Sequence, residues 1–110
     1  MYEFGTIVLV PFPFTDLSSA KVRPALIVTR DDHPGDDIIL CFITSRIEEG
    51  NPVQLLIDAD KRSGLKVRSV VRFDKIATLE KKIVLGELGR VDRSLLQKHG
   101  KKFHQVFGFE

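Results

Sequence analysis

Cysteine is scarce in this chain, and long apolar runs are missing. The 110 residues include one cysteine, Cys41, so no disulfide can form within one chain. Its position inside the apolar run 38–43 favours a small buried hydrophobe over a reactive thiol. No apolar stretch approaches the roughly 20 residues that span a bilayer, and residues 1–5 lack the basic start and apolar body of a secretory signal. We therefore expect a cytoplasmic protein with no membrane span.

Spacing typical of a metal site is also missing. His33 has acidic neighbours at positions 31, 32, 36 and 37, but this cluster has the composition of a solvated turn and not of an oxygen cage. His99 and His104 are five residues apart, which takes them off a common helical face. We expect neither a metal nor another cofactor.

The composition fits one folded domain over residues 1–110. Hydrophobic residues make up 43% and charged residues 29% of the chain, which is enough to bury roughly two thirds of its unfolded surface. There is no internal repeat and no low-complexity tract, and a second domain would have no core of its own.

The small net charge of +2 hides a strong asymmetry. Residues 1–60 hold four basic and ten acidic residues, a net of −6, whereas residues 61–82 hold eight basic and two acidic residues, a net of +6. We call residues 61–82 the basic stripe. Such a stripe is typical of proteins that bind a polyanion, because each neutralised phosphate releases counterions. A solvated surface with ordinary lysines remains the alternative from charge alone.

Short β-branched and apolar segments dominate the first 90 residues. They predict strands over 6–10, 25–29, 38–44, 54–57, 69–73, 75–79 and 83–87, with a bulge or break at Asp74. Residues 11–14 are expected to be extended because of their two prolines, and residues 15–22 to form a loop. Strands this short and this regularly spaced favour a mainly β fold, a small antiparallel barrel.

The C-terminal tail has a different pattern. Asp92 is a good N-cap, and apolar residues recur on one helical face at Leu95, Leu96, Phe103, Val106 and Phe107. We predict one helix that closes the barrel, with a kink possible at Gly100 because glycine disfavours helix interiors.

Polar residues interrupt or flank three apolar runs. Arg23 precedes residues 24–28, Thr44 and Ser45 follow residues 38–43, and Arg72 and Asp74 follow residues 70–71. If these runs are core strands, a rigid scaffold holds cations, hydroxyls and a carboxylate at the strand ends, which suits a phosphodiester. Each group also has a simpler structural interpretation. Arg23 pairs with Asp16, Thr44 and Ser45 start a turn, and Arg72 and Asp74 form an ordinary ion pair on one face of a strand.

Five segments, in order and with compatible spacing, resemble the PemK/MazF family of toxin endoribonucleases. They are Gly5-Thr-Ile-Val-Leu-Val-Pro-Phe-Pro-Phe-Thr-Asp, Lys21-Val-Arg-Pro-Ala-Leu-Ile-Val, Phe42-Ile-Thr-Ser, Ser69-Val-Val-Arg-Phe-Asp-Lys-Ile-Ala-Thr-Leu and Leu85-Gly-Glu-Leu-Gly. The resemblance implies an SH3-like barrel that forms a homodimer, cleaves single-stranded RNA without a metal and is neutralised by a cognate antitoxin. It also maps the catalytic arginine and hydroxyl of the family onto Arg23 and Thr44, and an alternative acid/base pair onto Arg72 and Asp74.

Metal-free cleavage of RNA makes these assignments chemically sensible. The ribose 2′-OH attacks the phosphate and must lose its proton while charge builds on the phosphoryl oxygens. Arg23 suits charge stabilisation and Thr44 suits orientation of the phosphate. Asp74 is positioned as a base, although its neighbour Arg72 lowers the pKa and weakens it in that role. Arg72 stays protonated and supports the leaving oxygen electrostatically.

Contacts to the RNA strand are assigned to Ser45, Phe14, Lys21 and Lys75. Two features depart from the family: the first loop has no histidine, and Ala77 stands where many members carry an arginine. The RNA sequence preference therefore stays open. The rival hypothesis is a non-catalytic SH3-like barrel that binds RNA or a partner peptide through the basic stripe.

Overall fold

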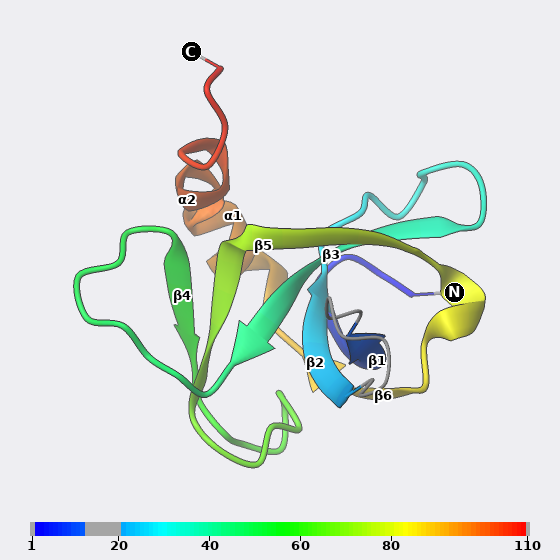
Figure 1. The fold of residues 1–110 in the computed structure, drawn as a ribbon, viewed down its shortest axis with the longest axis horizontal. Helices are drawn as coiled ribbons and strands as arrows, with labels where there is room; N and C mark the ends of the chain where they lie inside the picture. The colour runs from blue at the N-terminus through cyan, green and yellow to red at the C-terminus, as the bar shows by residue number, and fades with distance from the viewer. Residues whose placement is uncertain (1, 13–20, 110) are drawn as a thin grey trace.

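Six antiparallel strands form one sheet that curls into a half-barrel (Figure 1). A computed structural model of the chain describes residues 2–12 and 21–109. Its strands lie in the spatial order β4-β5-β3-β2-β1-β6. Their bounds are β1 Thr6–Phe12, β2 Lys21–Ile27, β3 Asp37–Thr44, β4 Gln54–Ile57, β5 Ser69–Glu80 and β6 Gly86–Arg90. The mainly β architecture predicted from the sequence is confirmed.

Strand β2 begins earlier than predicted. It includes Arg23, which lies opposite Val10 of β1, so this arginine is within the strand and not before it. Pro24 is tolerated there because β3 pairs only with Ala25–Ile27 of β2, which leaves the proline on a stretch with one neighbouring strand. The predicted loop over 15–22 is therefore wrong at Lys21 and Val22, and its other residues lie outside the described ranges.

Strand β5 unites the two segments predicted over 69–73 and 75–79. Its register with β3 shifts between Ile43, which faces Val71, and Cys41, which faces Ile76. Residues 72–75 of β5 therefore face a single residue of β3, Phe42. This irregularity is the bulge expected around Asp74. The strand bends sharply along its length (Figure 1).

The strand predicted over 83–87 is wrong at its start. Residues Lys81–Ile83 form a short 3-10 helix, η1, which ends where the Val84 amide donates to the Lys81 carbonyl at 3.1 Å. Strand β6 begins only at Gly86 and pairs with β1.

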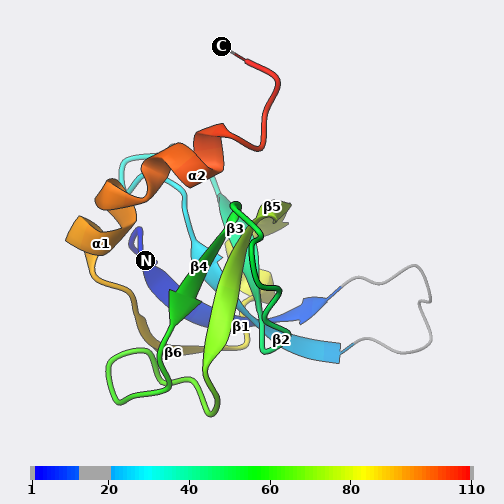
Figure 2. The ribbon, with the colours of Figure 1, turned by 90° about the vertical axis from the view of Figure 1, so that its left-hand side faces the viewer.

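The C-terminal tail forms two short helices where one was predicted. Asp92 caps α1 (Arg93–Lys98) by accepting a hydrogen bond from the Ser94 amide at 3.2 Å, as expected. The helix ends at Lys98, and α2 (Gly100–His104) begins after the single residue His99, so the glycine marks a break. Both helices lie together at one end of the curled sheet (Figure 2). No helix in the described part of the chain is long and apolar enough to cross a membrane.

Both faces of the sheet are apolar, because neighbouring residues of β1, β2 and β3 point to opposite sides and are buried on each. One core cluster includes Ile7, Leu26 and Cys41, and Leu96 of α1 packs into it. The other cluster includes Val8 and Ala25 with their neighbours. Cys41 is fully buried, as predicted, and burial, with a smaller effect of Asp74, raises the pKa of its thiol to about 12.

Candidate functional site

A groove of about 490 Å³ gathers several of the predicted site residues. Its polar lining consists of Arg23, Thr44, Ser45, Lys66, Ser69 and Lys75, and we call it the polar groove. Its apolar lining includes Phe12 and Phe42, whose rings meet edge to face with centroids 4.2 Å apart. The Ser69 hydroxyl is buried and donates to the Val67 carbonyl at 2.9 Å. Three cations and the hydroxyls of Thr44 and Ser45 beside an apolar surface match the needs of a strand with anionic linkages and flat bases.

The order of the strands explains why these residues meet. Strands β2 and β3 are neighbours, and antiparallel pairing brings the beginning of β2, with Arg23, near the end of β3, with Thr44. Lys75 reaches the same groove from the bulge of β5. Residues that are far apart in the sequence are thus combined on a rigid sheet.

Thr44 has the structural role of starting a turn. Its Oγ1 accepts a hydrogen bond from the backbone amide of Arg46 at 3.2 Å. The hydroxyl of Thr44 keeps its own proton for donation, so this contact is compatible with a phosphate ligand. Ser45 follows, is exposed and lines the groove as well.

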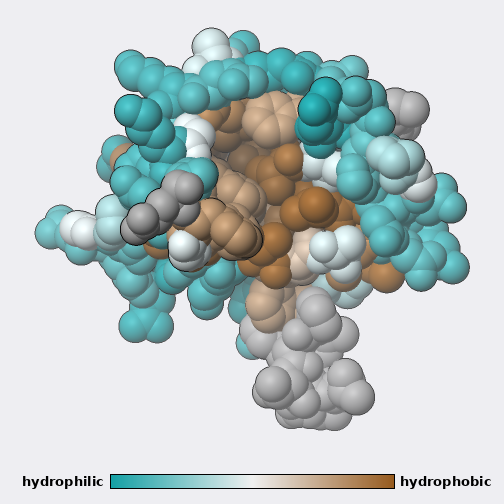
Figure 3. Space-filling view, turned by 90° about the horizontal axis from the view of Figure 1, so that it is seen from above, coloured by the Kyte–Doolittle hydropathy of each residue, from teal (hydrophilic) through white to brown (hydrophobic). Residues whose placement is uncertain are grey.

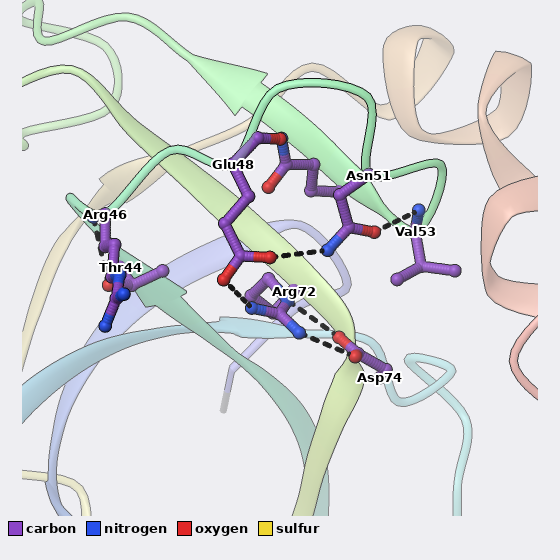
Figure 4. Close-up of polar contacts among 8 residues, drawn as sticks. Thr44, Arg46, Glu48, Asn51, Val53, Arg72 and Asp74 are labelled. Carbon is purple, nitrogen blue, oxygen red and sulfur yellow. Dashed lines mark hydrogen bonds and ion pairs between the residues drawn. The ribbon is translucent and has the colours of Figure 1, made fainter.

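Arg72 and Asp74 form a bidentate ion pair beside the polar groove. The guanidinium donates from Nε to Oδ1 at 2.8 Å and from Nη2 to Oδ2 at 2.7 Å (Figure 4). Both residues are absent from the described lining of the groove, although the next residue, Lys75, belongs to it. The structure therefore brings Arg23, Thr44 and Lys75 together and keeps the second predicted pair as an adjacent unit.

The ion pair changes the titration of both partners. The hydrogen bonds from Arg72 lower the pKa of the Asp74 carboxyl, and partial burial offsets only part of this effect. The same bonds raise the pKa of Arg72. Asp74 is thus a carboxylate at neutral pH, and it is a weaker proton acceptor than an isolated aspartate.

Glu48 is a further charged neighbour of Arg72, and it was not predicted from the sequence. Its Oε1 lies 3.7 Å from Nη1 of Arg72, so the arginine lies between two carboxylates (Figure 4). No local pattern could have revealed this contact, since Glu48 lies in the β3–β4 loop and reaches β5 only through the fold. Lys66 and Ser69 were also missed as groove residues, although Lys66 belongs to the basic stripe.

The remaining predicted contact residues are more scattered. Lys21 is exposed at the start of β2, opposite Phe12, and is not among the described lining residues of the polar groove. Phe14 and Asp16 lie outside the described residues. The pairing of Arg23 with Asp16 therefore stays untested.

The basic stripe is not one continuous surface. Arg68 pairs with Asp58 at 3.4 Å, Arg72 with Asp74, and Lys82 with Glu80 at 3.3 Å, so carboxylates balance several of its charges. The stripe also runs from the loop before β5 to η1 at the far end of that strand (Figure 1). Within it, Lys66 and Lys75 are the members that line the groove in the described residues. No group of three or more metal-binding side chains occurs in residues 2–12 and 21–109.

A second groove, of about 510 Å³, is apolar and aromatic. It lies between the C-terminal helices and the sheet and is lined mainly by Phe4, Val28, Phe73, Leu96, Phe103 and Phe107. On the face seen in Figure 3, apolar residues gather at the centre within a hydrophilic rim. This groove has few groups that would bind a phosphate, so the polar groove is the better nucleic-acid site.

A family model matches most of the chain. Residues 3–107 match the model described as PemK-like, MazF-like toxin of type II toxin-antitoxin system. No curated protein is significantly similar to the sequence.

Solved structures share the fold at low sequence identity. The toxin MazF-mt6 of Mycobacterium tuberculosis superposes with a TM-score of 0.74 at 23% identity, over 96% of this chain and 98% of that one. A mycobacterial endoribonuclease in complex with its cognate antitoxin gives a TM-score of 0.75 at 19% identity, over 100% and 98%. A MazE-MazF structure from Deinococcus radiodurans gives 0.76 at 23% identity, over 99% and 98%.

Proposed function

Because this chain belongs to the PemK-like, MazF-like toxin family of type II toxin-antitoxin systems, we propose that it is a toxin that cleaves single-stranded RNA. The observation that carries this proposal is the polar groove, in which Arg23, Thr44 and Lys75 line one cavity. Likeness to solved structures with MazF and endoribonuclease in their names supports it.

The proposed reaction uses the substrate's own hydroxyl as nucleophile. The ribose 2′-OH loses its proton and attacks the adjacent phosphorus, and the bond to the 5′-oxygen of the next nucleotide breaks. The products are a 2′,3′-cyclic phosphate and a 5′-hydroxyl, and the departing oxygen takes up a proton. The proposed reaction transfers one proton from the 2′-OH to the leaving oxygen and does not require a metal.

Arg23 and Thr44 have the leading roles in this proposal. The guanidinium of Arg23 stabilises the charge that builds on the phosphoryl oxygens, because a guanidinium is cationic and can donate two parallel hydrogen bonds to a phosphate. The hydroxyl of Thr44 orients the phosphate. Asp74 accepts the 2′-OH proton, although its hydrogen bonds with Arg72 make it a weaker base. Arg72 supports the leaving oxygen. Ser45, Lys21, Phe14 and Lys75 contact the strand.

We further propose that the protein acts in the cytoplasm as a homodimer that a cognate antitoxin neutralises. The likeness to MazE-MazF and toxin-antitoxin structures supports an antitoxin partner. Light scattering of the purified protein tests the dimer. Co-purification with a small acidic protein encoded by a neighbouring gene tests the antitoxin.

The decisive experiment for the activity compares two strands of one sequence in excess chelator. One is RNA, and the other carries 2′-deoxyribose at every position. Cleavage of the RNA alone, with a cyclic phosphate at the new 3′ end, supports the enzyme. Binding of both strands with neither cleaved supports a non-catalytic barrel and overturns the proposal.

A matched pair of variants tests the site. Arg23→Ala is expected to lose about 10²–10³-fold in kcat, the usual cost of removing one group that stabilises developing charge. Arg30→Ala removes an equal charge from an exposed surface pair with Asp32 and should retain full activity. Equal activity of both variants would remove Arg23 from the mechanism.

A further inference from the structure

Arg72 lies between two carboxylates, and only one of them holds it firmly. Asp74 takes the Nε and Nη2 edge through hydrogen bonds of 2.8 and 2.7 Å. Glu48 faces Nη1 at 3.7 Å, which is longer than the roughly 3.2 Å of an ordinary N–H···O hydrogen bond. A guanidinium has five N–H donors, so the Nη1 edge keeps donors that Asp74 does not use.

The β3–β4 loop holds the backbone of Glu48 in place. Gln54, which lies opposite Arg72 in the sheet, donates from its side-chain amide to the Glu48 carbonyl. The Asn51 side chain donates to Oε2 of Glu48 at 3.3 Å and accepts a hydrogen bond from the Val53 amide at 3.0 Å. The Gln54 contact thus anchors the main chain of Glu48 beside Arg72. The Asn51 contact reaches the Glu48 carboxylate (Figure 4).

The side chain of Glu48 is held only weakly, by the 3.3 Å hydrogen bond from Asn51 and the 3.7 Å contact with Arg72. It is 47% exposed, whereas that of Arg72 is 14% exposed. The carboxylate is therefore a loose counterion over the open edge of a well-held cation. A phosphate oxygen that approaches Arg72 needs the same Nη1 hydrogens and meets the same negative charge.

We infer that the Glu48 carboxylate is a competing counterion that occupies the Nη1 edge of Arg72 until a substrate phosphate displaces it. The inference rests on the proposed function and adds a residue to it. Because Asp74 already orients the guanidinium, Glu48 is not needed to place Arg72. Its carboxylate competes with the substrate, so it weakens binding and leaves the chemical step unchanged.

The variant Glu48→Gln isolates the charge. Glutamine keeps an oxygen that accepts the hydrogen bond from Asn51, so the loop is retained while the competing charge is removed. Glu49→Gln is the matched control, because it makes the same change of charge in the same loop at an exposed neighbour with no hydrogen bond or ion pair to Arg72 in the described residues.

Binding and turnover give the first readout. Fluorescence anisotropy with the all-2′-deoxy strand is expected to show binding that is tighter by about two- to fivefold in Glu48→Gln, the range of an exposed ion pair, and unchanged in Glu49→Gln. With RNA, KM should fall by the same factor and kcat stay within about twofold. Equal behaviour of the two variants, or a lower kcat in Glu48→Gln, overturns the inference.

Inorganic phosphate gives a second readout that does not depend on cleavage. The Nε–Hε NMR signal of Arg72 is followed during a phosphate titration of the wild type and both variants. The signal of Glu48→Gln should shift at a phosphate concentration about two- to fivefold lower than in the wild type. Identical titrations overturn the inference even if RNA is cleaved, whereas a lower midpoint supports it even if the protein proves to be no nuclease.

Discussion

Gly64 is expected to be the most costly glycine to replace in this protein. It has a φ of +71°, and an added Cβ would lie 2.0 Å from the backbone oxygen of Leu88 in β6. The positive φ alone costs an L-residue about 1–2 kcal/mol. The overlap with a backbone atom, which cannot rotate away, adds about 1–3 kcal/mol. Gly64→Ala should therefore destabilise the fold by about 2–5 kcal/mol.

Three other glycines separate the two contributions. Gly50 has a φ of +77° with nothing near its would-be Cβ, so its alanine variant should lose only about 1–2 kcal/mol. Gly89 has no positive φ, but its Cβ would lie 2.2 Å from the Arg62 oxygen, so overlap alone should cost about 1–3 kcal/mol. Gly86 has neither feature and should stay within about 1 kcal/mol of the wild type.

Urea unfolding at one pH measures all four variants, with unchanged m-values as the test that the unfolded states are comparable. The reasoning is refuted if Gly64→Ala is no more destabilising than Gly50→Ala. The result also bears on the site. The turn at Gly64 packs closely on β6, where the Arg90 amide donates to the Arg62 carbonyl at 2.8 Å, and it leads directly to Lys66 in the polar groove. Gly64→Ala should therefore weaken RNA binding as well.

Three further predictions follow from buried or paired groups. Asp74→Asn should be less stable than the wild type at pH 7, because Arg72 lowers the folded-state pKa of Asp74. The difference should begin to shrink as the pH falls through the ordinary aspartate pKa of about 3.9 and should disappear only below the lowered folded-state pKa. Urea midpoints from pH 7 down to about pH 2 measure it, and a pH-independent difference would contradict it. Cys41 should react with a thiol reagent on the order of a thousandfold more slowly in the native protein than in urea at pH 8, because burial raises its pKa to about 12; equal rates would show an accessible thiolate. Phe73→Ala should lower the free energy of unfolding by about 3–5 kcal/mol, because the buried ring of Phe73 packs against Phe103. Calorimetry measures this, and a decrease in unfolding free energy of less than about 1 kcal/mol would contradict that packing.

The strands were predictable where apolar residues had to be buried. The bounds of β4 (Gln54–Ile57) were predicted correctly, and β3 differs from its prediction by one residue. The start of β2 was missed because Lys21 and Arg23 are exposed, and their sequence has the polarity of a loop. The helical period predicted one helix with a kink at Gly100, and the break between α1 and α2 falls at that glycine.

The site was predictable only in part, for a related reason. Arg23 and Thr44 were predicted as site residues because each stands next to a buried run and matches a family motif, and both line one groove in the structure. Glu48 and Lys66 belong to loops, where local sequence has no periodicity that reports a partner. Their places depend on contacts such as Gln54 with the Glu48 carbonyl, which exist only in the folded chain.

Three consecutive residues of β5 serve different purposes. Arg72 and Asp74 meet on one side of the strand, whereas Phe73 points to the other side and packs on Phe103 of α2. On the proposed function, a mutational survey that scores only toxicity in cells is expected to show losses at all three positions. Loss at Arg72 or Asp74 would combine the proposed chemistry with the broken ion pair, and loss at Phe73 would reflect loss of folded protein, so abundance has to be measured beside toxicity to tell them apart.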